Sequence, residues 1–388
     1  MILLKYIMVF MLLFSSAVFA ADKPNWTIDY KRLNLPQNAK PVEIGKEINH
    51  DPKYKVQFTP DNKVLISFWE RRPQAELASK DMPEKSGTIF VVLLLSRETG
   101  ELIRRVEWPV LGETLPGQQI GYGSRIYPLP SGGYVGIINR HLQVLDSSFY
   151  VIHDRVLNIL GSGMYNIVMP LSGRFFILDV RYSLFKRTSE IIDSITFKII
   201  ERFDVPDFGI LDIWENHLLA LVRSNENSNR IDILKGEIGG TWNVLAQNLS
   251  YGRYMGSGKK SFIYNGAIVI EDIIGQMPLT KGIWYMIEDG KRSDQIYKGL
   301  LFKPSWNTPI VAVKGVELSD FRRALDLDSK DWIEAYDLST QQVLFKTRKY
   351  SASDIVDYTI SPNGDSIVLM TKKKIELFNV PAHGAKKK

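Results

Sequence analysis

The chain is dominated by one short pattern that recurs along it: an apolar run, a tight turn, and a second apolar run. The pattern is clearest in QFTPDNKVLISF at residues 57–68 and in DYTISPNGDSIVLMTKKKIELFNVP at residues 357–381. Short runs rich in β-branched and aromatic residues, bounded by Pro, Gly, Asn and Asp, are typical of β-strands joined by tight turns. A chain of 388 residues with this composition is therefore expected to be all-β.

Many of these runs are apolar at successive positions, as at residues 64–68 and 89–95. Strands that are buried on both faces have this pattern. In a β-propeller each blade is covered by its two neighbours, so antiparallel strands are also buried on both faces. The units recur every 45–50 residues or so, roughly the length of a four-stranded blade. We therefore predict an all-β β-propeller of about seven four-stranded blades, forming a single domain over residues 21–381.

The last unit contains only three predicted strands and stops at Pro381. A candidate for its missing strand is WTIDYKRLNLP at residues 26–36, which resembles the segments that end at Pro109 and Pro206. An open ring would leave an unpaired strand edge and an uncovered blade face. We therefore predict that the N-terminal segment pairs beside residues 375–380 and closes the ring.

The turns FTPDNKVL and ISPNGDSIV, with tails such as SRETGELIRRVEWP and DLSTQQVLFKTRK, resemble those of secreted bacterial β-propellers of the WD40-like or quinoprotein-like repeat superfamily. The resemblance covers most of the chain. The Trp-Asp and Gly-His marks of true WD40 repeats are missing from the sequence. The resemblance implies a propeller fold, and a fold of this kind hosts many unrelated functions.

The N-terminal residues predict export. Lys5 is the only charged residue in residues 1–20, residues 7–14 are apolar, and Val18-Phe19-Ala20 fits the small-x-small cleavage rule. This pattern predicts a signal peptide that is cut after Ala20 and a periplasmic or secreted protein. The alternative is an uncleaved membrane anchor. No later segment has the roughly 18 apolar residues that a span needs, so no stable membrane insertion is expected after cleavage.

Composition excludes several classes of site and partner. The sequence has no cysteine, which rules out disulfides, thiolate metal sites, thiol nucleophiles and a lipoprotein anchor. The formal net charge is +6 and is spread along the chain, whereas a nucleic-acid-binding protein carries a basic stripe or patch. Residues 382–388, which end in three lysines, are expected to be a disordered basic tail. The sequence does not indicate an oligomeric state.

The lengths of the predicted loops indicate that one face of the propeller binds a partner. The turns between first and second strands and between third and fourth strands are short, and in an up-and-down blade both classes lie on one face. The other connections are long, as at residues 70–87, 110–123, 181–190, 250–258 and 317–331. Long loops on one side of a rigid scaffold commonly carry recognition. The alternative is neutral insertion at a tolerant surface.

These long loops combine aromatic residues with cations, which suits a protein-binding patch or an anionic glycan. Salt bridges to neighbouring acidic residues would explain the same composition without a ligand. The sequence is thus interpreted as an exported, non-catalytic propeller that binds a protein or glycan partner through its long-loop face. The candidate partner-binding residues are Trp69, Arg71, Arg72, Tyr251, Arg253, Tyr254 and Arg322.

First strands begin at the same face, so their early polar residues are expected to approach the central channel. A polar ring there could hold a small ligand or a cation, or could simply solvate the channel. The candidates are Arg125, Asn166, Asp212, Asp354 and Asp357.

Motifs for catalysis are scarce. The sequence lacks HExxH, GxSxG, a phosphate loop and the SxDxGxTW box of sialidases. Quinoprotein dehydrogenases typically use a vicinal disulfide, which a chain without cysteine cannot form. The alternative function is a lactonase-like, metal-dependent hydrolase or lyase at the channel mouth. Calcium is the one cofactor that this alternative would require, and no other cofactor is predicted.

Overall fold

The protein is an all-β β-propeller, as the sequence predicts. A computed structural model describes residues 23–35, 40–41, 53–71, 85–111, 114–115, 118–119, 124–157, 164–169, 174–181, 187–204, 208–214, 216–223, 230–250, 261–264, 267–274, 281–288, 291–292, 297–298, 300–316, 330–351 and 354–381. The predicted signal peptide and the predicted basic tail lie outside these residues. Within them, no helix is long and apolar enough to cross a membrane.

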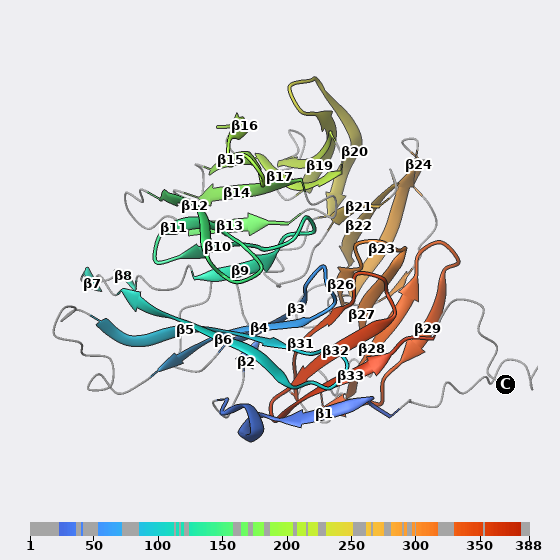
Figure 1. The fold of residues 1–388 in the computed structure, drawn as a ribbon. Helices are drawn as coiled ribbons and strands as arrows, with labels where there is room; N and C mark the ends of the chain where they lie inside the picture. The colour runs from blue at the N-terminus through green and yellow to red at the C-terminus, as the bar shows by residue number, and fades with distance from the viewer. Residues whose placement is uncertain are drawn as a thin grey trace, which may run out of the picture.

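Six blades are each built from one continuous segment, with their strands in chain order (Figure 1). Blade 1 contains β2 (Lys40–Pro41), β3 (Lys53–Phe58), β4 (Val64–Arg71), β5 (Lys85–Leu95) and β6 (Leu102–Leu111). Blade 2 contains β9 (Arg125–Pro128), β10 (Tyr134–Ile138), β11 (His141–Leu145) and β12 (Val151–Val156). Blade 3 contains β13 (Met164–Val168), β14 (Phe175–Arg181), β15 (Arg187–Asp193) and β16 (Ile199–Phe203).

The remaining three continuous blades follow along the chain. Blade 4 contains β17 (Phe208–Trp214), β18 (His217–Arg223), β19 (Arg230–Glu237) and β20 (Trp242–Ser250). Blade 5 contains β21 (Ser261–Tyr264), β22 (Ala267–Ile274), β23 (Lys281–Glu288), β24 (Lys291–Arg292) and β25 (Tyr297–Lys298). Blade 6 contains β26 (Leu300–Pro304), β27 (Ile310–Val316), β28 (Lys330–Asp337), β29 (Gln342–Lys346) and β30 (Tyr350–Ser351). A separate hairpin joins β7 (Thr114–Leu115) to β8 (Gln118–Gln119).

A further sheet, the composite sheet, is shared between the two ends of the chain. It contains β31 (Ile355–Ile360), β32 (Ser366–Thr371) and β33 (Lys374–Asn379), and β1 (Trp26–Asp29) pairs antiparallel with β33. Trp26 lies opposite Leu377 and Asp29 lies opposite Lys374. After β1 the chain forms the short 3-10 helix η1 (Tyr30–Leu33). That this pairing closes the whole ring stays a prediction.

The predicted count of about seven four-stranded blades needs correction. The structure has six blades formed by continuous segments, together with the composite sheet. Blades 1, 5 and 6 each hold a fifth strand, since the two-residue strands β2, β25 and β30 pair with β3, β23 and β28. A strand of two residues has no periodicity of its own, so sequence patterning could not reveal these additions.

The core lies between blades, and alternate residues of one strand face different neighbours. In β5, Ile89, Val91, Leu93 and Leu95 pack with the composite sheet, whereas Phe90, Val92 and Leu94 pack with blade 2. All of these side chains are buried. This alternation follows from the period of two in a strand, and it explains why the run is apolar at every position.

The short turns on one face connect neighbouring blades. The guanidinium of Arg97 in blade 1 lies 2.8 Å from a carboxylate oxygen of Asp365 in the composite sheet. On the other side, the Asn307 N–H of blade 6 donates to the Pro362 carbonyl at 2.9 Å. Gly364 in this turn has φ +72°, and an added Cβ would lie 2.6 Å from Thr308 Oγ1 of blade 6. Both the positive φ and the close approach require glycine here.

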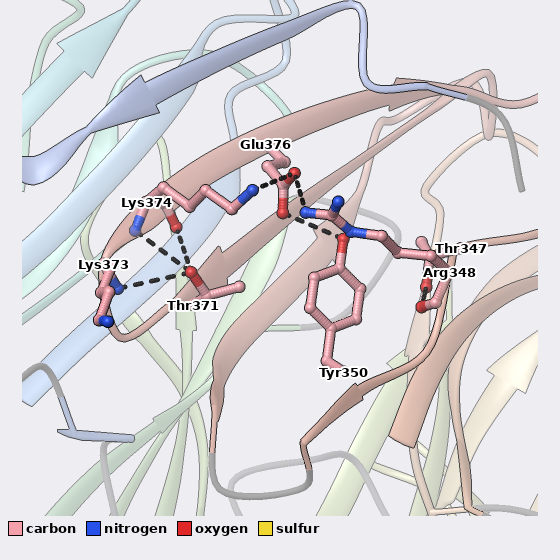
Figure 2. Close-up of polar contacts among 7 residues, drawn as sticks. All are labelled: Thr347, Arg348, Tyr350, Thr371, Lys373, Lys374 and Glu376. Carbon is pink, nitrogen blue, oxygen red and sulfur yellow. Dashed lines mark hydrogen bonds and ion pairs between the residues drawn. The ribbon is translucent and has the colours of Figure 1, made fainter. Parts of the chain in front are cut away.

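A buried carboxylate joins the composite sheet to blade 6 (Figure 2). The Oε1 atom of Glu376 on β33 accepts hydrogen bonds from Arg348 and Lys374, each at 2.9 Å. Its Oε2 accepts a hydrogen bond from the Tyr350 hydroxyl at 3.0 Å. Burial, reinforced by the Glu376 charge, raises the pKa of Tyr350, so this hydroxyl keeps its proton. Because Arg348 and Tyr350 belong to the end of blade 6, Glu376 ties the two sheets together.

Candidate anion site at the centre of the propeller

The first long strands of the blades lie toward the middle of the molecule, and in blade 1 this strand is β3, since β2 has only two residues. In blade 1, β3 contacts β31 of the composite sheet and also β9 of blade 2, and in blade 4, β17 contacts β21 of blade 5. Figure 1 shows β3 beside β31, and β26 of blade 6 also contacts β31. The fourth strands β12 and β16, by contrast, are mostly exposed. Polar side chains on first strands of different blades can therefore meet near the axis.

Blades 1 and 2 bring three such side chains together. The Lys55 ammonium on β3 lies 3.7 Å from the centre of the Tyr127 ring on β9. Arg125 stands two residues before Tyr127, so it lies on the same face of β9. Both Lys55 and Arg125 act electrostatically on the Tyr127 phenol. Neither Lys55 nor Tyr127 was anticipated from the sequence.

Blade 6 and the composite sheet add an ion pair to this group. The Lys303 ammonium on β26 contacts Asp357 Oδ1 on β31, and both side chains are mostly buried. Asp357 Oδ2 accepts a hydrogen bond from the Val56 backbone N–H of blade 1 at 2.9 Å. Lys303 also lies 4.9 Å from the centre of the Tyr358 ring. Lys55, Arg125, Tyr127, Lys303 and Asp357 are called the central cluster below.

The central cluster contains three basic side chains and one carboxylate. Burial lowers the pKa of Lys55, and Lys303 and Arg125 lower it further, while Tyr127 and Asp357 act in the opposite direction. Burial raises the pKa of Tyr127, but Lys55 and Arg125 outweigh this effect and hold that pKa below its ordinary value. Both shifts reflect an excess of basic groups held away from bulk water. An added carboxylate would favour the charged form of Lys55.

The structure thus assembles two of the predicted channel residues, Arg125 and Asp357. Asp212 is fully buried on β17 of blade 4, and Asp354 is partly exposed just before β31. Asn166 lies on β13 opposite Asp179, and its side chain lies outside the described residues. One signal could have revealed Lys303, because it is the one charged residue of β26 (LLFKP), whereas Lys55 does not stand out in β3 (KYKVQF), where polar and apolar residues alternate.

The residues predicted for the long-loop face fall mostly outside the described residues: Arg72, Tyr251, Arg253, Tyr254 and Arg322 do so, as does the side chain of Arg71. Trp69 is described, and its ring centre lies 5.8 Å from that of Phe90. It packs against the apolar cluster between blades 1 and 2, so it contributes to packing at that interface. Recognition by the long-loop face stays a prediction.

The metal-dependent alternative also stays a prediction. Among the described residues, no three His, Asp or Glu side chains are placed to hold a metal ion. Asp357, one of the predicted ligands, is instead engaged by a lysine and a backbone N–H.

The sequence matches no protein-family model and no curated protein. Among solved structures, the chain is similar to an acylaminoacyl peptidase of Pyrococcus horikoshii, with 11% identity and a TM-score of 0.54 over 85% of this chain and 52% of that chain. The chain thus spans about half the length of that peptidase.

Two further structures are similar. One is the β-propeller domain of the Trilobed protease from Pyrococcus furiosus, reported to have an open velcro topology, with 11% identity and a TM-score of 0.50 over 85% of this chain and 96% of that chain. The other is BamB from Moraxella catarrhalis, with 11% identity and a TM-score of 0.40 over 87% of each chain, which is too low to support an argument. At this identity, the first two similarities show the β-propeller fold alone.

Proposed function

We propose that the protein is a non-catalytic binding propeller whose central cluster receives an acidic segment of a protein partner. The observation that carries this proposal is the grouping of basic side chains: among the described residues, Lys55 and Arg125 meet at Tyr127, and Lys303 pairs with Asp357 beside them. Arginine offers a planar fork that suits a carboxylate, and lysine offers a compact charge beside it. An acidic side chain of the partner would add a carboxylate to this grouping.

A peptide fits this cluster better than a glycan does. Sugar rings stack on open aromatic faces, but Lys55 already lies over the ring of Tyr127 and Lys303 lies near the ring of Tyr358. An acidic side chain, in contrast, needs only the ends of the basic residues. The glycan partner that the long loops would also suit is therefore an alternative outcome of the test below.

The proposal includes export, which rests on the signal-like residues 1–20. The expected product is a periplasmic or secreted protein that starts at Ala21. N-terminal sequencing of the protein recovered from its native host checks this, and an intact Met1 end would contradict it.

The binding test uses a fluorescein-labelled hexaglutamate peptide and fluorescence anisotropy. Replacing Lys55 and Arg125 by glutamine should weaken binding by tenfold or more, since a hydrogen bond to a charged group contributes about 1.5–3 kcal/mol. Binding by the unaltered protein should also weaken as salt or pH is raised, because salt screens the charges and the charged form of Lys55 is lost at high pH.

The matched control is Lys198→Gln, which removes one exposed lysine outside the central cluster. It should bind the peptide as the unaltered protein does, and all variants should keep the same melting temperature. Equal peptide binding by the Lys55/Arg125 variant would overturn the proposal. If the protein bound a sulfated oligosaccharide more tightly than hexaglutamate, the partner would be an anionic glycan and not an acidic peptide.

The metal-dependent alternative predicts a different response. If calcium were bound by residues such as Asp354 and Asp357, millimolar calcium chloride would stabilise the fold, because a ligand that binds only the folded state raises its stability. Since Asp357 is ion-paired with Lys303, we expect no change in melting temperature on adding calcium or EDTA. A calcium-dependent rise that is lost in Asp357→Asn would support the hydrolase or lyase instead.

A further inference from the structure

The outer rim of the propeller exposes large apolar side chains along one arc. Among the residues that the structure describes, ten such side chains are exposed, and they lie on or just before the outer strands β6, β12, β16 and β20 of blades 1 to 4. They are Leu102 and Ile103 of blade 1, Tyr150, Val151, Ile152 and Val156 of blade 2, Ile195, Ile199 and Ile200 of blade 3, and Val244 of blade 4. This set is called the apolar arc.

The outer strands of the composite sheet and of blade 6 are different. In β1 of the composite sheet, Ile28 is buried and Trp26 is only partly exposed. In β29 of blade 6, Phe345 is buried, and Val343 and Leu344 are partly buried. Outer strands of this propeller therefore do not all expose apolar side chains; those of blade 5 have side chains that lie outside the described residues.

The arc is continuous from blade 2 to blade 3. The His153 ring on β12 stacks on Phe197 with ring centres 5.3 Å apart, and its Nε2 lies 3.1 Å from the Ile195 carbonyl oxygen. Arg155 on the same strand forms a 2.7 Å ion pair with Glu190 on β15. These contacts hold the exposed residues of both blades in one surface.

The strands of the arc are also sheet edges. β12 and β16 are the terminal strands of their sheets, so one side of each backbone has no partner strand within its sheet. Natural edge strands are commonly blunted by charged side chains, proline or β-bulges. Charged residues stand in the middle of both strands here, Asp154 and Arg155 in β12 and Glu201 and Arg202 in β16. The apolar side chains on either side of these charges form a surface that a partner can cover.

We propose that a second copy of this chain provides the cover, with the outer strands of blades 2 and 3 meeting the same strands of the other copy across a two-fold axis. Exposed apolar patches of a few hundred Å² mark interaction surfaces, and a standard interface takes about 800 Å² from each partner. Seven of the ten side chains of the apolar arc lie on blades 2 and 3, and each of the seven is 44% or more exposed.

The charged residues within the apolar arc favour a second copy of this chain over a charged partner as its occupant. Asp154 lies 2.9 Å from His141, Arg155 is paired with Glu190, and Arg202 lies 3.3 Å from Asp204. Arg155 and Arg202 are thus each balanced by a carboxylate of the same chain, and Asp154 is balanced when His141 is protonated. A surface of this kind does not repel itself, which a two-fold interface requires because each patch meets its own equivalent.

Sedimentation velocity of the mature chain over a range of concentrations tests this proposal. The unaltered protein should form a dimer, and Ile152→Lys or Ile195→Lys should weaken the dimer by tenfold or more, because each places an unpaired ammonium in the covered surface. These side chains are 57% and 67% exposed, so the melting temperature of the dissociated chain should not fall. The two variants are measured separately, so that the test still holds if one of them does not fold.

The control is Gln342→Lys, an exposed change on β29 away from the arc, which should leave the dimer intact. A protein that is monomeric at every concentration would overturn the proposal, and so would a dimer that both arc variants leave unchanged. If the monomer instead bound neutral phosphatidylcholine vesicles, the arc would be a lipid-facing surface and the dimer proposal would fail. None of these outcomes depends on the central cluster.

Discussion

Deletion of residues 24–36 is expected to replace a single cooperative melting transition with a broad one at much lower temperature. The segment contains β1, which pairs with β33 at four positions, and four buried residues, Ile28, Tyr30, Leu33 and Leu35. Burial of each such side chain contributes about 1.5–3 kcal/mol. Their sum is comparable with the 5–15 kcal/mol or so that separates a folded domain from its unfolded state.

Because the deleted segment contains Tyr30, its removal should cost more stability than the removal of an ordinary edge strand. Its ring lies 5.4 Å from that of Tyr54 in blade 1, and Tyr54 in turn stacks on Phe68 at 4.8 Å. Its hydroxyl donates a hydrogen bond to the Thr371 carbonyl of β32. Tyr30 therefore joins the composite sheet to blade 1, so its removal opens the interface between the first and last parts of the propeller.

Two controls sharpen the deletion experiment. Removing residues 382–388, the predicted basic tail, should leave the melting curve unchanged. Adding a synthetic peptide of residues 24–36 to the truncated protein should restore part of the cooperative transition, since the peptide can pair with β33 again. If the truncated protein melts cooperatively at the original temperature, the N-terminal strand does not close the ring.

Replacing Glu376 by alanine is expected to lower the free energy of unfolding by about 3 kcal/mol, because breaking a buried ion pair leaves its partners without compensation. Three groups lose their acceptor together: Arg348, Lys374 and the buried hydroxyl of Tyr350. The Tyr350 hydroxyl contributes most to the loss, since Arg348 can turn toward water and a buried tyrosine cannot.

Urea unfolding of a matched series measures this effect. Glu376→Gln keeps the shape and the acceptor oxygen, so it should lose about 1 kcal/mol, less than the alanine variant. Glu98→Ala removes an exposed carboxylate on a short turn and should stay within about 0.5 kcal/mol of the unaltered protein. A Glu376→Ala protein as stable as Glu98→Ala would show that this carboxylate does not hold blade 6 to the composite sheet.

The fold could be predicted because its signals are local. The Thr59 to Lys63 turn carries its own hydrogen bonds, with Thr59 Oγ1 accepting from the Lys63 N–H at 2.9 Å, and Asn62 has φ +61°. The apolar run of β5 showed burial on both faces at every position. The two-residue strands were missed because they depend on a neighbouring strand and not on a pattern of their own.

The central cluster could be predicted only in part, because its contacts join distant segments. The Val56 N–H meets Asp357 across 301 positions of sequence, and only the packing of first strands brings them together. A bulge between Ile355 and Asp357 also shifts the register of β31 against β32. Counting alternate residues from Asp354 therefore does not tell which acidic residue points to the neighbouring blades. Arg125 and Asp357 were predicted from their position early in a first strand, whereas Lys55 is one of several polar residues in β3 and Lys303 is a single charge in β26.

The most direct test of the central claim is a crystal structure of the protein soaked with hexaglutamate. We predict electron density for a carboxylate within hydrogen-bonding distance of Lys55 and Arg125, beside the Lys303–Asp357 ion pair. Ordered peptide elsewhere on the propeller, with the central cluster unchanged, would contradict the assignment of this site.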